Sequence, residues 1–242
     1  MNYLQANPAN PACVLDEVWD VSEAHATKVA DAYVQFVASS KSKFKPWNIS
    51  ILKADTEELV FRTSFFNDFY AGMWRTDSKH GHPAFQKKFR EWKAKNPDKA
   101  PEGALKSQTR LTFLASCGKL GPKHVHIGDR VAMRFTAFRT AGELNGFFEY
   151  DFKDANATNW SAFSALGVKQ TTVMQAGPST LAHIIVTTNE TATKQGIDKV
   201  IAKVNRSAGW NYDGMGGYTK WYWGTCIYNK GTLKNVWLNP KL

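Results

Sequence analysis

The order of extended and helical patterns in the first third of the chain restricts its fold more than any other sequence feature. Val14 to Val21 has the composition of a strand, and Ser22 then precedes a segment whose apolar residues recur at three- and four-residue spacing as far as Ser39. Two strand-like runs follow, residues 47–52 and 58–66, separated by a short polar turn. This order of strand, helix, strand, strand predicts an α+β fold built on an antiparallel sheet.

A second helix is predicted over residues 83–95. It begins at Pro83, which suits the first turn of a helix, and the Asn96-Pro97 pair ends it. Its apolar stripe consists of Phe85, Phe89 and Trp92. The rest of its circumference is basic: Lys87, Lys88, Arg90, Lys93 and Lys95. The segment is therefore expected to be a basic amphipathic helix.

Most of the remaining chain has the composition of strands. Strands are predicted at 110–115, 124–138, 144–152 and 181–187, a short helix at 159–166 and a longer helix at 190–204. The last aromatic run, 218–228, is expected to form a hairpin with 232–238 across Asn229-Lys230-Gly231. The chain as a whole is thus predicted to contain antiparallel sheets with two to four helices.

The expected domain organisation is one α+β domain over residues 14–242, preceded by an extended arm at 1–13 that carries a short Asn-Pro repeat. Residues 96–108, with two prolines and one glycine, are the most linker-like segment. They divide the domain into candidate halves, 14–95 and 109–242. The arm could contact a neighbouring subunit, so a homo-oligomer is one expectation for the assembly.

Composition excludes a disordered chain, because hydrophobic residues make up 43% of the sequence and aromatic residues 13%. The net charge of +10 favours an acidic partner such as nucleic acid or another polyanion, although it could serve solubility alone. Three cysteines without a short spacing favour a reducing intracellular compartment such as the cytoplasm. No apolar run is long enough to predict an integral membrane segment.

Two helices are predicted to open with similar residues, Glu23-Ala24-His25-Ala26-Thr27-Lys28 and Glu190-Thr191-Ala192-Thr193-Lys194. This echo suggests a duplicated β-α-β-β unit over residues 13–66 and 181–238. The alternative is an accidental match, because alignment on Ala-Thr-Lys puts the apolar stripes of the two helices out of phase. A duplicated unit of this kind resembles the ferredoxin-like, dimeric α+β-barrel group of small proteins. The resemblance implies a fold shared with oxygenases, haem proteins and proteins of no known activity, and it implies no role for any single residue.

Four of the six histidines occur in two His-x-His pairs, His80-Gly81-His82 and His124-Val125-His126. On a strand, His124 and His126 would point to the same face and could bind a divalent metal ion together with Asp129. The alternative is a pair of solvated histidines.

The second pair also resembles the metal-binding motif of the single-strand nucleases that initiate rolling-circle replication. Tyr150-Asp151-Phe152-Lys153 matches the Tyr-x-x-Lys element of those nucleases in letters, although Tyr150 lies in a strand-like run. That resemblance implies a metal-dependent enzyme in which Tyr150 attacks a phosphodiester.

Basic and aromatic residues alternate near the end of the chain. On a strand, Trp221 and Trp223 would share one face, with Lys220 and Tyr222 on the other. Such residues could stack on bases and contact phosphates, or the tryptophans could belong to the core.

The primary functional prediction is a non-catalytic binding or assembly protein without a cofactor, contacting nucleic acid or another polyanion. Its expected footprint comprises Lys87, Lys88, Arg90, Lys93, Lys95, Lys220, Trp221, Tyr222 and Trp223. The alternatives are a histidine-metal enzyme and a small-molecule-binding α+β-barrel protein.

Overall fold

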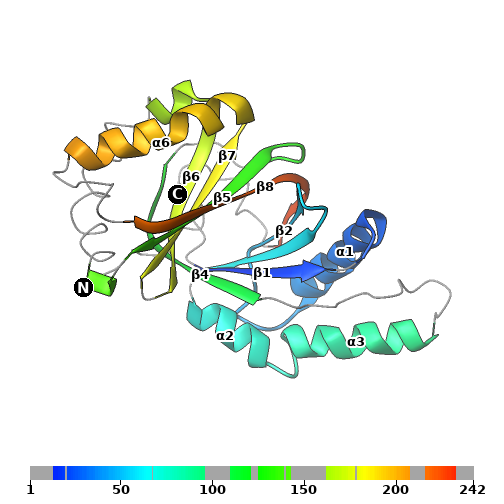
Figure 1. The fold of residues 1–242 in the computed structure, drawn as a ribbon. Helices are drawn as coiled ribbons and strands as arrows, with labels where there is room; N and C mark the ends of the chain where they lie inside the picture. The colour runs from blue at the N-terminus through cyan, green and yellow to red at the C-terminus, as the bar shows by residue number, and fades with distance from the viewer. Residues whose placement is uncertain are drawn as a thin grey trace. The chain divides into compact units, whose positions relative to one another are not determined.

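The computed structural model describes residues 13–19, 21–66, 68–95, 110–120, 125–138, 140–142, 162–177, 179–207 and 216–232. The chain divides into two compact units. Among the described residues, those up to Thr112 and from Ile227 onward form the N-terminal unit, and those from Phe113 to Cys226 form the C-terminal unit. Each unit is an antiparallel sheet with helices, as the α+β prediction requires (Figure 1).

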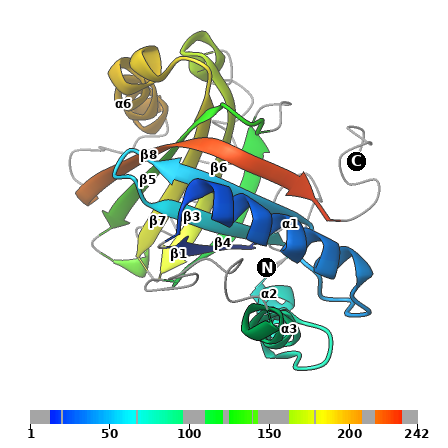
Figure 2. The same cartoon turned by 90° about the vertical axis from the view of Figure 1, so that its right-hand side faces the viewer.

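The N-terminal unit follows the predicted order of its first elements. These are β1 (Cys13–Trp19), α1 (Glu23–Ser39), β2 (Asn48–Ala54) and β3 (Leu59–Phe65). The strands lie in the order β1-β3-β2, with antiparallel pairing between neighbours. Helix α1 crosses one face of this sheet (Figure 2). Two further helices complete the unit, α2 (Asp68–Thr76) and α3 (His82–Lys95).

The start of α1 is fixed by its own sequence. The Ser22 hydroxyl accepts a hydrogen bond from the backbone N–H of His25, which satisfies one of the free donors of the first turn. The residues of the helix that face the sheet are buried: Ala26, Val29, Ala30, Tyr33 and Val37. They pack on the alternate residues of β1, β2 and β3 that point to the same side, including Leu15, Ile49, Ile51 and Phe61. The core of the unit therefore lies between α1 and the sheet.

Strands β1 and β3 also carry a buried ion pair. Asp16 faces Arg62 across the two strands, and both Asp16 oxygens accept hydrogen bonds from the guanidinium, at 2.8 and 2.7 Å. This two-bond geometry is what allows two charged groups to remain inside a protein. Cys13, on the same strand, is a buried free thiol, and burial followed by the charges of Asp68 and Asp16 raises its pKa to about 12.

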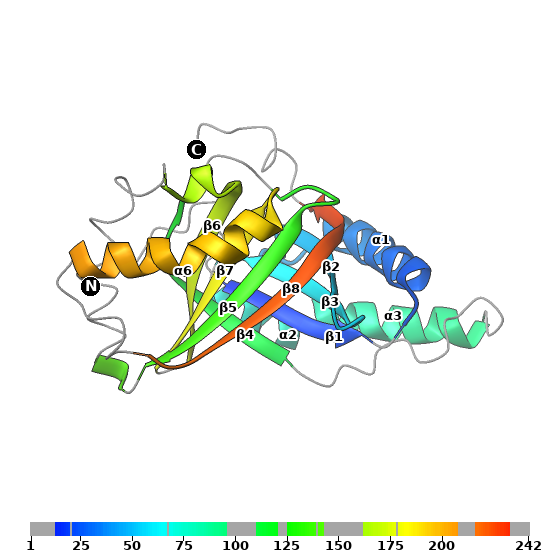
Figure 3. The same ribbon diagram turned by 45° about the horizontal axis from the view of Figure 1, so that its top comes forward.

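The C-terminal unit contains one long sheet. Its elements are β4 (Arg110–Leu120) from Phe113 onward, β5 (Arg130–Phe138), β6 (Val168–Gly177), β7 (Thr180–Thr187), α6 (Glu190–Ser207) and β8 (Gly216–Gly231) as far as Cys226. The strands lie in the order β8-β5-β7-β6-β4. Helix α6 lies against this sheet (Figure 3), and Ile197 on the helix packs with Ala132, Phe163, Val168 and Ile185.

The hairpin predicted at Asn229-Lys230-Gly231 is wrong, because β8 runs without interruption from Gly216 to Gly231. Its first part pairs with β5, and its last residues are held in the N-terminal unit. There the Tyr228 hydroxyl donates to the Asp31 carboxylate on α1 at 2.9 Å, and Lys230 pairs with the same carboxylate. These distant contacts keep the strand extended where local turn residues favoured a reversal.

In the part of the chain that the structure describes, no helix combines the length and the apolar character needed to cross a membrane. The strand predicted at 144–152 lies outside the described residues.

Candidate functional site

A pocket of about 350 Å³ lies between α1 and α3 in the N-terminal unit. Helix α1 contributes the residues beside its buried face, and α3 contributes its aromatic stripe. The lining residues are His25, Lys28, Val29, Ala32, Phe36, Phe85, Lys88, Phe89 and Trp92. The walls are mainly apolar, and the volume falls at the lower end of the range of small-molecule sites, roughly 300–1,000 Å³.

Aromatic rings form the most continuous wall of the pocket. Phe85 and Phe89 are stacked with their centroids 5.9 Å apart, and Phe89 and Trp92 are stacked at 6.0 Å. Phe36 of α1 meets Phe85 at 5.5 Å and joins the two helices. The predicted stripe of α3 is thus confirmed as a contiguous surface, but Trp92 remains 44% exposed. An aromatic surface that is left this open can still contact a ligand.

The pocket carries basic groups at its exposed side. Lys28 and Lys88 are both exposed, and the Lys88 ammonium lies 5.3 Å from the centroid of the Phe36 ring. His25 is half-buried, and its Nδ1 atom lies 2.8 Å from the Ser22 hydroxyl. The contact with the capping residue Ser22 therefore also holds the His25 imidazole in position in the pocket lining.

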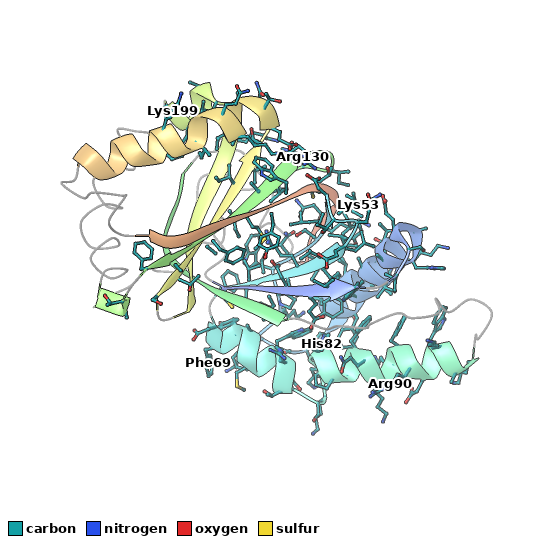
Figure 4. The ribbon with its side chains drawn as sticks, viewed as in Figure 1. Lys53, Phe69, His82, Arg90, Arg130 and Lys199 are labelled. Carbon is teal, nitrogen blue, oxygen red and sulfur yellow. The ribbon has the colours of Figure 1, made fainter. Side chains whose placement is uncertain are left out.

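A buried polar cluster adjoins the apolar wall. The Trp74 indole N–H donates to the Tyr33 hydroxyl at 2.7 Å, and that hydroxyl lies 3.2 Å from Nδ1 of His82. Tyr33 is also in ring contact with Phe85, at 4.7 Å, so Phe85 touches both the polar cluster and the pocket. Figure 4 labels His82 at the first residue of α3.

Burial determines the protonation states of this cluster. Desolvation lowers the pKa of His82, although the nearby Glu17 carboxylate opposes the shift. Desolvation also raises the pKa of Tyr33, despite the hydrogen bond from Trp74. The cluster is satisfied when neutral Tyr33 accepts from Trp74 and donates its own proton to Nδ1 of His82. Neutral His82 then carries its proton on Nε2.

The basic residues predicted on α3 divide between the pocket lining and the rest of the helix surface. Lys87, Arg90 and Lys95 are exposed and do not line the pocket, whereas Lys88 does. Arg90 is labelled on α3 in Figure 4. Lys93 is partly buried.

The aromatic residues predicted on β8 divide between the two faces of the strand. Tyr222 is 41% exposed and makes a T-shaped ring contact with Phe135. Trp223 packs against the core cluster of the C-terminal unit, with the Lys194 ammonium 4.8 Å from its ring centroid. The side chains of Lys220 and Trp221 lie outside the described residues.

The described residues of the predicted histidine-metal site, His126 and Asp129, do not lie on a strand. Residues 125–129 form a turn before β5, in which Gly128 adopts a positive φ of 92°. Asp129 accepts a hydrogen bond from the backbone N–H of His126 at 2.7 Å and pairs with Lys169 at 2.5 Å. His124 and Tyr150 lie outside the described residues.

No group of three or more metal-ligating side chains occurs within the described ranges. The metal site at His124, His126 and Asp129 stays a prediction. His82, from the other pair, belongs to the buried cluster with Tyr33.

Comparison with solved structures places the chain in a fold class. A candidate monooxygenase from Lactobacillus acidophilus NCFM matches with a TM-score of 0.54 and 10% identity, over 92% of this chain and 97% of that one. A candidate monooxygenase from Fusobacterium nucleatum matches with a TM-score of 0.51 and 8% identity, over 92% and 95%. No family model and no curated protein matches the sequence. The ferredoxin-like α+β fold is confirmed, and at these identities the likeness concerns the fold alone.

The primary functional prediction, a non-catalytic protein that binds nucleic acid or another polyanion, was wrong. The two solved structures above are described as candidate monooxygenases and not as nucleic-acid-binding proteins. The geometry agrees, because the α3 stripe lines a pocket with α1 and Trp223 packs on a core. No resemblance to the rolling-circle nucleases appears in these matches.

Sequence reasoning missed the contribution of α1 to the site. His25, Lys28 and Ala32 lie beside the buried face of that helix, and their spacing is compatible with an ordinary solvated surface. Phe36 was assigned to the apolar face, but not to a site. The aromatic stripe of α3 could have indicated the site, because an apolar stripe on a helix is expected to pack against another element.

Proposed function

We propose that the protein binds an apolar small molecule in the pocket between α1 and α3. The observation that carries this proposal is the pocket itself, a 350 Å³ space walled by four aromatic rings and two aliphatic side chains. Sites for small molecules are characteristically concave and apolar, with a few polar groups that orient the ligand. The fold agrees with this proposal, because two solved structures that share it are described as candidate monooxygenases.

The exposure of the lining favours a ligand over a closed core. Phe85 is only 7% exposed, whereas Trp92 is 44% exposed on the same stripe. A ligand that covered the Phe89–Trp92 side of the stripe would remove apolar surface from water, at about 25 cal/mol per Å². The pocket therefore offers binding free energy that the protein alone does not use.

The proposal is tested with N-phenylnaphthylamine, a neutral dye whose fluorescence rises in apolar surroundings. Ala32 lies exposed on the pocket side of α1, so Ala32→Trp fills the space and should weaken binding at least about ten-fold. Ala38→Trp is the matched control, because Ala38 is also exposed on α1 but does not line the pocket. It should bind the dye as the wild type does.

Circular dichroism of each variant confirms that the helices are retained. If the wild type fails to bind the dye, or if Ala32→Trp binds it as tightly as Ala38→Trp, the proposed site is wrong.

A further inference from the structure

We infer that the ligand of this pocket is an organic anion, with an apolar body and one carboxylate or sulfonate group held by Lys88 and Lys28. This inference rests on the proposed function and adds the charge of the ligand to it. Its first support is the composition of the lining, in which every formally charged residue is a lysine and none is acidic. A pocket that is apolar inside and positive at its exposed side matches a molecule with the complementary arrangement.

The two lysines have no competing carboxylate in the described ranges of the chain. No ion pair within 4 Å joins either Lys28 or Lys88 to an acidic side chain among those residues, whereas neighbouring acids are engaged elsewhere. Glu23 pairs with Lys53 at 3.6 Å, and Asp31 pairs with Lys230. Glu91 on α3 is exposed and does not line the pocket. Among the described residues, no acidic side chain therefore neutralises the charge of the two lysines.

The location of Lys88 makes it the stronger of the two anion-binding groups. Its ammonium lies over the Phe36 ring, so part of its hydration is replaced by an apolar wall. An anion that pairs with it there is less screened than one at an open surface, because the wall excludes water from one side. Lys28, on the facing helix, can approach the same anion from the α1 side.

The apolar walls exclude a second class of anion. Inorganic phosphate and other small polar anions would gain the two charges but would leave the aromatic surface uncovered. An amphipathic anion can satisfy both parts of the site, with its ring or chain against the Phe85–Phe89 stack and its charged group at the lysines. Recognition therefore requires both features in one molecule.

The test compares two dyes that share an aromatic framework. Anilinonaphthalene sulfonate carries one negative charge, and N-phenylnaphthylamine is its neutral counterpart. The wild type should bind the anion more tightly than the neutral dye, by about three- to ten-fold at low ionic strength. Lys88→Met keeps the length of the side chain and removes its charge, so the ratio of the two affinities should fall towards one.

Lys87→Met is the matched control, because Lys87 is exposed on the same helix and does not line the pocket. It should keep the wild-type ratio. Equal affinity of the wild type for both dyes, or equal ratios in Lys88→Met and Lys87→Met, would overturn the anion inference while the proposed pocket stands. If the wild type binds neither dye, the proposed pocket is wrong as well.

Discussion

Replacing Tyr33 with phenylalanine removes one hydroxyl group from the interior of the N-terminal unit and leaves the ring in place. That hydroxyl accepts from the Trp74 indole N–H at 2.7 Å and lies 3.2 Å from Nδ1 of His82. Trp74 is 1% exposed and Tyr33 2% exposed, so water cannot readily replace the lost group. The substitution therefore leaves a buried donor on Trp74 without its partner.

The expected loss follows from the energy of an unsatisfied buried group. Stranding one such donor lowers the free energy of unfolding by about 1–3 kcal/mol. For a chain of this size, that loss lowers the thermal midpoint by roughly 2–4 °C per kcal/mol. The ring contacts of residue 33 with Phe61 and Phe85 are retained, so cavity formation adds little to the loss.

The assay is urea denaturation followed by circular dichroism, applied to a double-mutant cycle of Tyr33→Phe and Trp74→Phe. The double variant has neither the indole N–H nor the hydroxyl. Its loss in free energy of unfolding should therefore be about 1 kcal/mol smaller than the sum of the losses in the two single variants. Tyr222→Phe is the control, because Tyr222 is 41% exposed and its change should stay within about 0.5 kcal/mol. The hydrogen-bond argument is refuted if Tyr33→Phe lowers the free energy of unfolding no more than the control does. It is also refuted if the losses of the two single variants are strictly additive in the double variant.

Two further predictions concern the same unit. At Gly81 a Cβ would lie 2.1 Å from the backbone carbonyl oxygen of Trp74, so Gly81→Ala should lower the free energy of unfolding by at least about 2 kcal/mol. Gly72→Ala, in α2 with nothing within 4 Å of the added Cβ, should be neutral or stabilise by up to about 1 kcal/mol in the same urea assay. Burial lowers the pKa of His82 in the folded state, so below about pH 6.5 the unfolded chain takes up a proton that the folded chain resists. The free energy of unfolding should therefore fall as the pH drops below this value, and it should fall less steeply in His82→Asn. If the urea midpoints of the two proteins change in parallel from pH 7 to pH 5, the lowered pKa of His82 is not the cause.

Elements determined by local chemistry could be predicted from the sequence. The Ser22 cap and the three- and four-residue apolar spacing of α1 act within a few residues, so the helix and its buried face were predicted correctly. Helix α2 was missed, although Asp68 accepts a hydrogen bond from the N–H of Phe69 at its start. Nine residues give too short an apolar pattern to distinguish a helix from a connecting segment.

Elements determined by distant contacts could not be predicted in the same way. Asn229-Lys230-Gly231 has the residues of a turn, but Tyr228 and Lys230 bind Asp31, nearly the whole length of the chain away. The site shows the same limit. The stripe of α3 was identified, but nothing local indicates that its partner is α1, and the charge around it suggested a polyanion instead.

The same geometry also orients the ligand that we propose. Phe85 is 7% exposed and is packed on Tyr33, whose hydroxyl is held between Trp74 and His82, so this end of the pocket wall is rigid. Trp92, Lys28 and Lys88 are exposed, so the other end can adjust its side chains. A rigid apolar surface favours a complementary apolar body because little side-chain freedom is lost on binding, whereas flexible lysines at the exposed end can follow a solvated charge. The apolar part of the ligand should therefore lie against Phe85, with its anionic group at the exposed end beside Lys88.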